Sequence, residues 1–333
     1  MTKLSFLDLV NVVEGETSAD AIRRVGPLAA HAEACGYHRY WIAEHHGMAG
    51  VAAAATSLII AEAGRTTSTM RIGSGGIMLP NHSPLVIAEQ FGTLDALYPG
   101  RIDLGLGRAP GADGRVAQAL RRDFMREAEE FPRNVVELRA HFTGDPELGV
   151  LAVPGRGAQV EMWILGSSLF GAQLAAALGM PYAFASHFAP DLLDEALMIY
   201  RRDFRPSQHL RAPYAAAALS AIAADSAEEA ELIASSMMQN FVALRTGRPG
   251  KLPPPVENYV ASLDPSISAM LGHVLQCATF GTVEDVTQGL NRFIKRTQVD
   301  EVIVHSAAFD PQARMRSVAL IAQAFEHLAL PAA

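Results

Sequence analysis

The chain has 333 residues, of which 50% are hydrophobic and 19% are charged, and its 27 Lys and Arg against 35 Asp and Glu give a formal net charge of −8. This apolar content excludes an intrinsically disordered chain, and the acidic balance without a long basic run excludes the charge pattern of a nucleic-acid-binding protein. We therefore expect a globular protein that acts on small molecules, with no nucleic acid among its partners.

Three features bear on the compartment. The longest apolar run, residues 51–61, is interrupted by Thr56 and Ser57 and is much shorter than the roughly 20 residues that cross a bilayer. The first residues predict no signal peptide, because Asp8 interrupts the apolar stretch and no small-residue cleavage site follows. The two cysteines, Cys35 and Cys277, are too few for a disulfide framework. We expect a cytoplasmic protein without a membrane partner.

Strand-like and helix-like segments alternate from one end of the chain to the other. The expected strands cover residues 4–10, 39–43, 70–77, 102–106, 161–165, 182–186, 214–221 and 301–304. The expected helices cover residues 20–35, 52–65, 84–97, 131–142, 169–178, 191–204, 226–246, 283–296 and 311–328. Such alternation predicts an α/β fold, a parallel sheet with helices outside it. Eight units predict a closed (β/α)8 TIM barrel, since a doubly wound sheet more often stops at about five to seven strands.

Two segments are longer than a minimal barrel needs. Residues 108–160 hold more chain than one helix requires, and residues 247–282 begin with the sequence GRPGKLPPPVENY. Proline removes amide donors and restricts the residue before it, so this second stretch predicts neither helix nor strand. Long irregular insertions often act as lids. We find no repeat and no linker, and we expect a single barrel domain over residues 1–333 with insertions near 108–160 and 247–282.

Polar residues and glycines gather after the expected strands. Along the chain these residues are Glu44, His45, His46, Ser74, Gly75, Gly76, Gly105, Gly107, Arg108, Gly166, Ser167, Ser168, Ser186, His187, His305 and Ser306. Barrel enzymes place their chemistry at the carboxyl ends of the strands, so this rim is the predicted site.

The adjacent histidines His45 and His46 allow two interpretations. Both can be surface residues, one of which caps a turn. An imidazole, whose ordinary pKa is about 6.5, also suits an acid, a base or a hydrogen-bond donor at a barrel rim. The sequence has no HExxH motif, and its two cysteines cannot complete a zinc site, so we expect no metal.

Two turns are candidates for phosphate binding. Residues 105–111, GLGRAPG, lack the dinucleotide spacing and the P-loop lysine, but their small side chains let backbone amides approach a ligand beside Arg108. Ser167 and Ser168 lead directly into a helix whose first amides and dipole favour an anion. The alternative is that a serine here only caps the helix.

Four long blocks carry a family resemblance. They are YHRYWIAEHHGM (residues 37–48), RIGSGGIMLPNHSPLVIAEQFGTLDALYPGRIDLGLGRAPG (71–111), WILGSSLFGAQLAAALGMPYAFASHF (163–188) and GTVEDV (281–286). These blocks resemble the bacterial-luciferase-like flavin-dependent monooxygenases, in particular the subgroup of single-chain luciferase-family oxidoreductases. The resemblance covers nearly the whole chain and implies a (β/α)8 barrel with insertions.

The resemblance also implies roles for single residues. His45 matches the catalytic histidine near the flavin, and Gly75–Gly76 matches the position of a non-proline cis peptide beneath the flavin ring. The implied cofactor-binding residues are Ser74, Gly75, Gly76, Gly107, Arg108, Gly166, Ser167 and Ser168, and the implied substrate-pocket residues are His46 and His187. The sequence departs from the family at Gly107, where luciferases carry a reactive cysteine, at Gly171, where a hydroxyl is common, and at Ser186, which replaces a histidine.

The implied activity is a two-component monooxygenase reaction on a small organic substrate. Reduced FMN is supplied by a separate flavin reductase and reacts with O2, while the protein orients the reactants and excludes water. The alternatives are hydride transfer with the deazaflavin F420, a non-catalytic flavin-binding protein, and a flavin-free barrel isomerase or hydrolase. The family and the alanine-rich segment 52–65 also suggest a homodimer.

Overall fold

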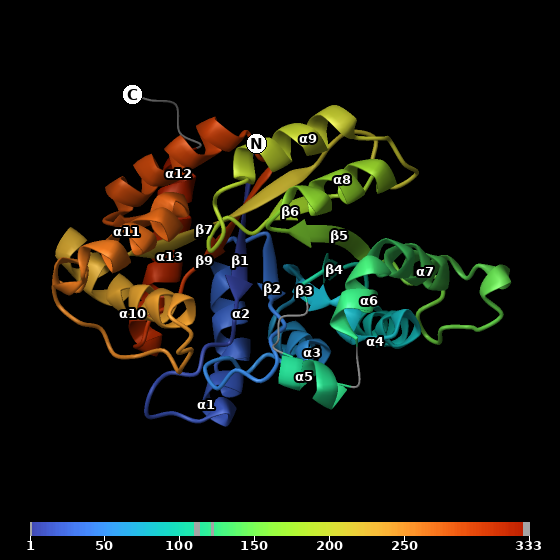
Figure 1. The fold of residues 1–333 in the computed structure, drawn as a ribbon, viewed down its shortest axis with the longest axis horizontal. Coiled ribbons are helices and arrows are strands. Elements are labelled where there is room, and N and C mark those ends of the chain that lie inside the picture. The colour runs from blue at the N-terminus through green and yellow to red at the C-terminus, as the bar shows by residue number, and fades with distance from the viewer. Residues whose placement is uncertain (1, 110–113, 121–122, 329–333) are drawn as a thin grey trace.

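Eight parallel strands close into a barrel in this computed structural model, which describes residues 2–109, 114–120 and 123–328 (Figure 1). The barrel strands are β1 (Lys3–Asp8), β2 (Arg39–Ile42), β3 (Arg71–Met78), β4 (Ile102–Gly107), β5 (Glu161–Gly166), β6 (Tyr182–Phe184), β7 (Ala215–Ala223) and β9 (Glu301–His305). Each strand pairs with its neighbours in parallel, and the β6–β7, β7–β9 and β9–β1 pairings complete the ring. The predicted barrel is confirmed.

Helices follow the strands and surround the barrel (Figure 1). They are α1 (Ser18–Arg23), α2 (Val25–Ala34), α3 (Thr56–Thr66), α4 (Pro84–Leu97), α5 (Gly114–Leu120), α6 (Phe124–Glu129), α7 (Phe131–Thr143), α8 (Leu169–Leu178), α9 (Leu193–Asp203), α10 (Ala227–Arg245), α11 (Pro265–Val274), α12 (Val283–Thr297) and α13 (Pro311–Leu328). Side-chain capping fixes the first residues of two helices. Thr17 with Asp20 forms a capping box at α1, and Thr282 with Asp285 forms one at α12.

The structure corrects three predicted boundaries. The helix expected over residues 20–35 is two helices that meet at Arg24, and the helix expected from residue 52 begins at Thr56. The segment 247–282 is only partly irregular, because it contains α11 and a ninth strand, β8 (Ala278–Gly281), which extends the sheet beside the carboxyl end of β7. Its proline-rich start lies outside helix and strand, as predicted, apart from one isolated bridge between Val13 and Leu252.

Side chains that point into the barrel form layers along its axis. Alternate residues of a strand face opposite sides, so one set from each strand faces the axis. The middle layer is apolar and is formed by Leu7, Trp41, Ala43, Trp163, Ala183, Ala216, Ala218 and Ile303. Trp41 and Trp163 meet edge to face with ring centroids 5.1 Å apart. This plug separates the amino end of the barrel from its carboxyl end, which we call the mouth.

A buried ionic cluster fills the amino end. The guanidinium of Arg39, at the start of β2, lies 2.8 Å from Asp103 on β4 and 3.0 Å from both Glu161 on β5 and Glu301 on β9. Arg39 is 3% exposed, and Asp103 and Glu301 are completely buried. A second cation, Arg71, hydrogen-bonds Asp103 at 2.7 Å. Charges from five strands, β2, β3, β4, β5 and β9, are thus tied together across the barrel axis.

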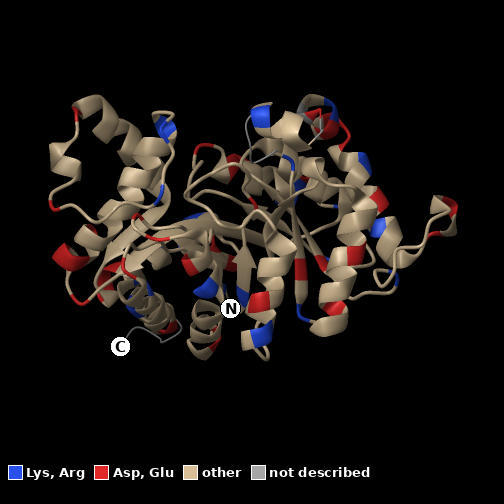
Figure 2. Ribbon diagram, turned by 90° about the horizontal axis from the view of Figure 1, so that it is seen from below, with Lys and Arg blue, Asp and Glu red and all other residues tan. Residues whose placement is uncertain are grey.

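On the face seen in Figure 2, charges of both signs lie on the described part of the outer helices. Basic and acidic residues are interspersed over the outer helices (Figure 2), so the face seen there has no basic stripe. Among the described residues, no helix combines the length and apolar character needed to cross a membrane.

We predict that Arg39→Leu lowers the free energy of unfolding by about 3–5 kcal/mol, because it leaves buried carboxylates without their counter-charge. The control is Arg65→Leu, which removes an exposed ion pair with Glu62 and is expected to cost at most about 1 kcal/mol. Urea unfolding of both variants measures the difference. Equal losses would show that the ionic cluster does not hold the barrel.

Candidate active site

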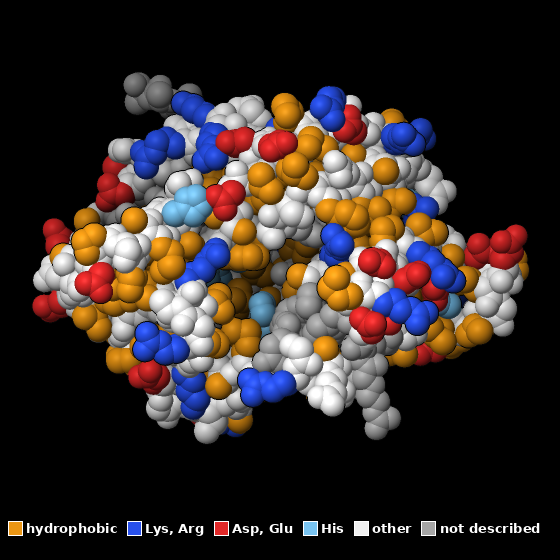
Figure 3. All heavy atoms as spheres, viewed as in Figure 1, with side chains coloured by type: hydrophobic (Ala, Val, Ile, Leu, Met, Phe, Trp, Pro, Cys, Tyr) orange, Lys and Arg blue, Asp and Glu red, His pale blue; other side chains and the backbone are white. Residues whose placement is uncertain are grey.

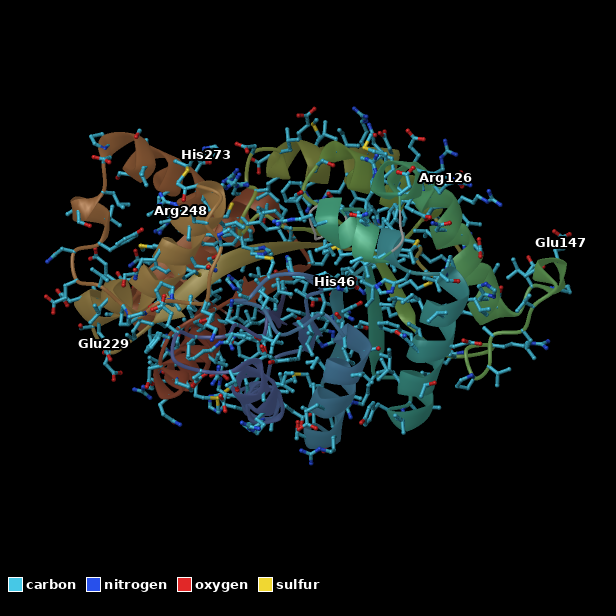
Figure 4. All side chains as sticks on the ribbon, turned by 60° about the horizontal axis from the view of Figure 1, so that its bottom comes forward. His46, Arg126, Glu147, Glu229, Arg248 and His273 are labelled. Atoms are coloured by element: carbon cyan, nitrogen blue, oxygen red, sulfur yellow. The ribbon has the colours of Figure 1, made fainter. Side chains whose placement is uncertain are left out.

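The mouth lies where the sequence predicted the site. A hollow near the centre of the molecule contains apolar side chains and a histidine (Figure 3). His46 lies between the β4–β5 insertion, which carries Arg126, and the segment after α10, which carries Arg248 (Figure 4). Both insertions expected from the sequence therefore lie beside the mouth.

Glycines let β3 and β4 approach closely below the mouth. The peptide bond between Gly75 and Gly76 is cis, as the resemblance implies. A Cβ on Gly76 would lie 2.5 Å from the carbonyl oxygen of Gly105, and one on Gly107 would lie 2.8 Å from the sulfur of Met78. Packing of the two strands therefore requires glycine at position 76, whereas a side chain at position 107 would displace only the side chain of Met78.

Ser74 is positioned differently from a cofactor ligand. Its side chain is completely buried, and its hydroxyl donates to the carbonyl oxygen of Gly105 at 3.0 Å. Ser74 also belongs to the outward-facing set of β3, with the core residue Ile72. Its hydroxyl therefore contributes to strand pairing, and only its backbone is left for the predicted cofactor contact.

Glu44 organises one side of the mouth. Its Oε1 accepts hydrogen bonds from Nε2 of His46 at 2.7 Å, Nε2 of His82 at 2.8 Å and Nδ2 of Asn81 at 3.1 Å. Its Oε2 accepts from the amide of Met78 at 3.1 Å. This carboxylate joins the loop after β2 to the turn after β3, and the joined segments include the predicted pocket residue His46.

Hydrogen bonding keeps Glu44 ionised. Burial opposes its charged form, but the hydrogen bonds from His46, His82 and Asn81 outweigh burial and lower the pKa of Glu44 to about 2. Within the described residues, Glu44, His46 and His82 are the one His/Cys/Asp/Glu group whose ligand atoms all lie within 4.8 Å of one another. Their 2.7 and 2.8 Å separations are hydrogen-bond lengths, which favours a hydrogen-bonded cluster over a metal centre.

A second group of histidines lies at the mouth. Its members are His45, which follows β2, His187, which follows β6, and His305, which ends β9. His187 and His305 are buried with ring centroids 5.4 Å apart, and His45 interacts electrostatically with His187. Burial, followed by the neighbouring imidazoles of His305 and His45, holds the pKa of His187 well below its usual value. Burial likewise lowers the pKa of His45, and burial together with Arg314 lowers that of His305 to about 4. All three rings are therefore neutral at pH 7.

Arg108 follows β4, and the two serines follow β5 at the start of α8. The guanidinium of Arg108 lies 4.2 Å from the ring centroid of Phe170 and donates to the carbonyl of Ala128 at 3.1 Å. Ser167 and Ser168 are exposed, and the hydroxyl of Ser168 makes no capping bond although Ser168 is the N-cap of α8. Ser168 thus occupies the cap position of the sequence alternative, but its hydroxyl is not used for capping.

Gly171, one departure from the family pattern, lies in a closely packed place at the start of α8. A Cβ on Gly171 would lie 3.3 Å from the ring of Tyr182 and 3.4 Å from the Cα of Gly166. A side chain at this position would be tight, and the ring of Tyr182 would have to yield by a few tenths of an ångström. Of the glycine-rich turn at residues 105–111, the last two residues lie outside the described part of the chain.

Sequence reasoning missed two members of these groups. His82 lies just after the short 3-10 helix 79–81, within the quoted NHSPL block, and its link to Glu44 spans 38 residues. The sequence places His305 on the rim but assigns it no role. Its position at the end of the last barrel strand, in register with Ser220, is the signal that marks it.

Comparison with known proteins agrees with this geometry. The model of the luciferase-like monooxygenase family matches residues 1–301. The chain belongs to the luciferase-like monooxygenase family. It is 50% identical to a luciferase-like monooxygenase of Escherichia coli strain K12 over 325 residues, which are 97% of each chain.

Two solved structures share the fold. The chain is similar to apo-MsnO8, with a TM-score of 0.86, 32% identity and 98% of each chain covered. The oxygenating constituent of 3,6-diketocamphane monooxygenase from Pseudomonas putida, in complex with FMN, has a TM-score of 0.72 at 16% identity, with 99% of this chain and 100% of that one covered. The second likeness concerns the fold alone.

We predict that Glu44→Gln lowers the free energy of unfolding by about 2–4 kcal/mol, because an amide nitrogen would face hydrogen-bond donors in a buried site. The matched control is Glu62→Gln on the surface of α3, with an expected loss of at most about 1 kcal/mol. Urea unfolding at pH 7 is the measurement. A loss no larger than that of the control would mean that Glu44 does not organise this side of the mouth.

Proposed function

We propose that the protein is a two-component monooxygenase that uses reduced FMN and O2 on a small organic substrate. The observation that carries the proposal is the pairing of Arg108 with the first turn of α8. A cation, two exposed serine hydroxyls and the positive end of a helix dipole meet there, which is the combination that binds a phosphate.

The rest of the mouth fits a flavin as well. Gly75 is partly exposed at the carboxyl end of β3, where the absence of side chains leaves a surface that a flat ring can approach. The buried Nδ1 of His45 has no hydrogen-bond partner, so it remains available to a bound group. FMN, when bound and reduced, supplies the two electrons that allow one oxygen atom of O2 to enter the substrate and the other to leave as water.

The chain itself supplies binding, orientation and proton control. Arg108, Ser167 and Ser168 would hold the phosphate, and backbone groups of Gly75, Gly76, Gly107 and Gly166 would border the cofactor. His45, kept neutral by burial, would donate or accept a proton at Nδ1. The segment 247–264 and α11, which pack beside α10, would limit the access of water.

Partners follow from this function. A separate flavin reductase would supply the reduced FMN. We also propose a homodimer through α3 and α4, on which Leu58 and Leu97 are 71% and 58% exposed. The small residues of segment 52–65 are divided: Ala54 and Ala55 are exposed, whereas Gly64 faces inward, where a Cβ would lie 2.5 Å from the ring of Tyr98 in the same chain.

The direct test is anaerobic titration with photoreduced FMN and, separately, with reduced F420, followed by addition of O2. Selective binding of FMN with O2 consumption is expected. Binding of F420 without O2 consumption would place the protein in the hydride-transfer alternative. FMN binding without any effect on the reaction with O2 would support a flavin-binding protein instead.

We predict that Arg108→Ala weakens FMN binding about tenfold or more and leaves riboflavin binding nearly unchanged, because only FMN carries the phosphate. Arg126→Ala, another exposed arginine of the same insertion, is the control and should change neither affinity. Fluorescence titration measures both ligands. Equal losses for FMN and riboflavin would remove Arg108 from the phosphate site.

We predict that His45→Ala keeps FMN affinity within about twofold but increases H2O2 release about tenfold or more once O2 is added, because proton control at the reacting group is lost. The exposed His209→Gln serves as the control. Peroxide release is measured in a coupled assay with photoreduced FMN. An unchanged rate would remove His45 from the reaction.

A further inference from the structure

A cavity of about 140 Å³ lies outside the barrel wall, between α2 and α13. Its described lining is mostly apolar and includes Val13, Leu28, Ala308, Phe309 and Met315. On β1, Leu7 faces the barrel axis, so its neighbours Phe6 and Asp8 face the surrounding helices. Arg314, which also lines the cavity, pairs with Asp8 and lies 5.7 Å from the ring centroid of Phe6. The cavity is therefore on the helix side of the wall and is separate from the mouth.

The charged residues in the described lining of this cavity, Arg24 and Arg314, are already paired. Arg24 forms an ion pair with Glu16 and donates to the carbonyl oxygen of Asn11 at 3.4 Å. Arg314 lies 2.8 Å from Asp8. A charged ligand would have to compete with one of these ion pairs, so the cavity favours an uncharged ligand.

Asn11 brings an unpartnered polar group to the cavity. The residue lines the cavity and is 8% exposed, and its Oδ1 is buried without a hydrogen-bond partner. Such a group costs about 1–3 kcal/mol and is rare in native proteins. An amide oxygen accepts hydrogen bonds and cannot donate them, so the group that satisfies it must carry an N–H or an O–H. Ketones, ethers and other groups that only accept do not fit this atom.

We propose that this cavity binds a single-ring apolar molecule with one uncharged hydrogen-bond donor, such as a phenol. The donor would bond to Oδ1 of Asn11, and the ring would lie among the apolar side chains. The size agrees with this ligand, because an apolar protein cavity of about 150 Å³ holds a benzene molecule. The site lies outside the mouth, so this inference goes beyond the proposed function and does not depend on a flavin.

The cavity lies behind the loop that holds segment 247–264. Val13 lines the cavity and forms the isolated bridge with Leu252. The amide of Leu252 donates to the carbonyl of Val12, and the amide of Glu14 donates to the carbonyl of Leu252, each at 2.9 Å. A ligand that packs against Val13 adds contacts to this attachment. The amide of Leu252 is therefore expected to exchange with solvent more slowly when the cavity is filled.

The test uses the full chain labelled with 13C in the methionine methyl groups, with the signals of Met315 and Met78 assigned by Met→Leu variants. Met315 reports on the cavity, and Met78, at the carboxyl end of β3, reports on the mouth. Four probes are added separately at pH 7.5: phenol, toluene and fluorobenzene, which are nearly equal in size, and the anion benzoate.

Phenol is expected to bind about fivefold more tightly than toluene or fluorobenzene, because only phenol can donate to Asn11. It should shift the signal of Met315, leave that of Met78 in place and slow the exchange of the Leu252 amide. A shift of Met78 alone, or binding of any other probe as tight as that of phenol, would overturn the proposal. Unchanged exchange at Leu252 with phenol bound beside Met315 would overturn the connection to segment 247–264.

Asn11→Leu provides a variant that is expected to fold, because an apolar group of similar shape replaces an unpartnered buried amide. Its melting temperature should equal or exceed that of the unchanged protein. Phenol binding should weaken about fivefold, whereas toluene binding should not weaken. The control is Asn291→Leu on the exposed side of α12, which should change neither affinity. Equal phenol affinity in Asn11→Leu and in the unchanged protein would contradict the role of Asn11 and with it the requirement for a donor.

Discussion

The ionic contact of Arg39 is the constraint on which the rest of the barrel depends. One guanidinium on β2 binds carboxylates on β4, β5 and β9, so it connects β2 to three strands that are not its neighbours in the ring. Breaking it would leave charges in an environment where they cannot be hydrated. Trp41 and Trp163 extend the same cluster, since their indole nitrogens donate to Asp103 and Glu161, each at 2.9 Å. The apolar plug is thereby attached to the charged base.

In this layered interior, the residues that stabilise the barrel are different from the residues at the mouth that can hold a ligand. The amino end carries charge that is fully paired, the middle carries large rings that interlock, and the mouth carries polar atoms that have no partner in the protein. The cost of unsatisfied groups at the mouth is tolerable because the layers below do not depend on them. A barrel with all its polar groups satisfied internally would have nothing left with which to hold a ligand.

The sequence allowed the barrel strands and the rim to be predicted because alternation and strand ends are local patterns. It did not reveal β8, a four-residue strand whose pairing depends on the overhanging end of β7. It did not reveal the partners of Glu44 either, since the contact with His82 joins two loops that only the barrel brings together. The motif containing Ser74 was recognisable, but the direction of its hydroxyl follows from strand pairing and is not visible in the motif.

The adjacent histidines His45 and His46 belong to different groups of residues at the mouth. His46 lies in hydrogen-bond contact with an ionised carboxylate, and its ring is held by Glu44 beside His82. His45 belongs to the axial group with His187, where burial keeps the rings neutral. A neutral ring without a fixed partner can exchange a proton with a bound molecule, whereas a ring bound to a carboxylate is restricted in position and in the proton it carries. We therefore propose a reactive role for His45 and a positioning role for His46.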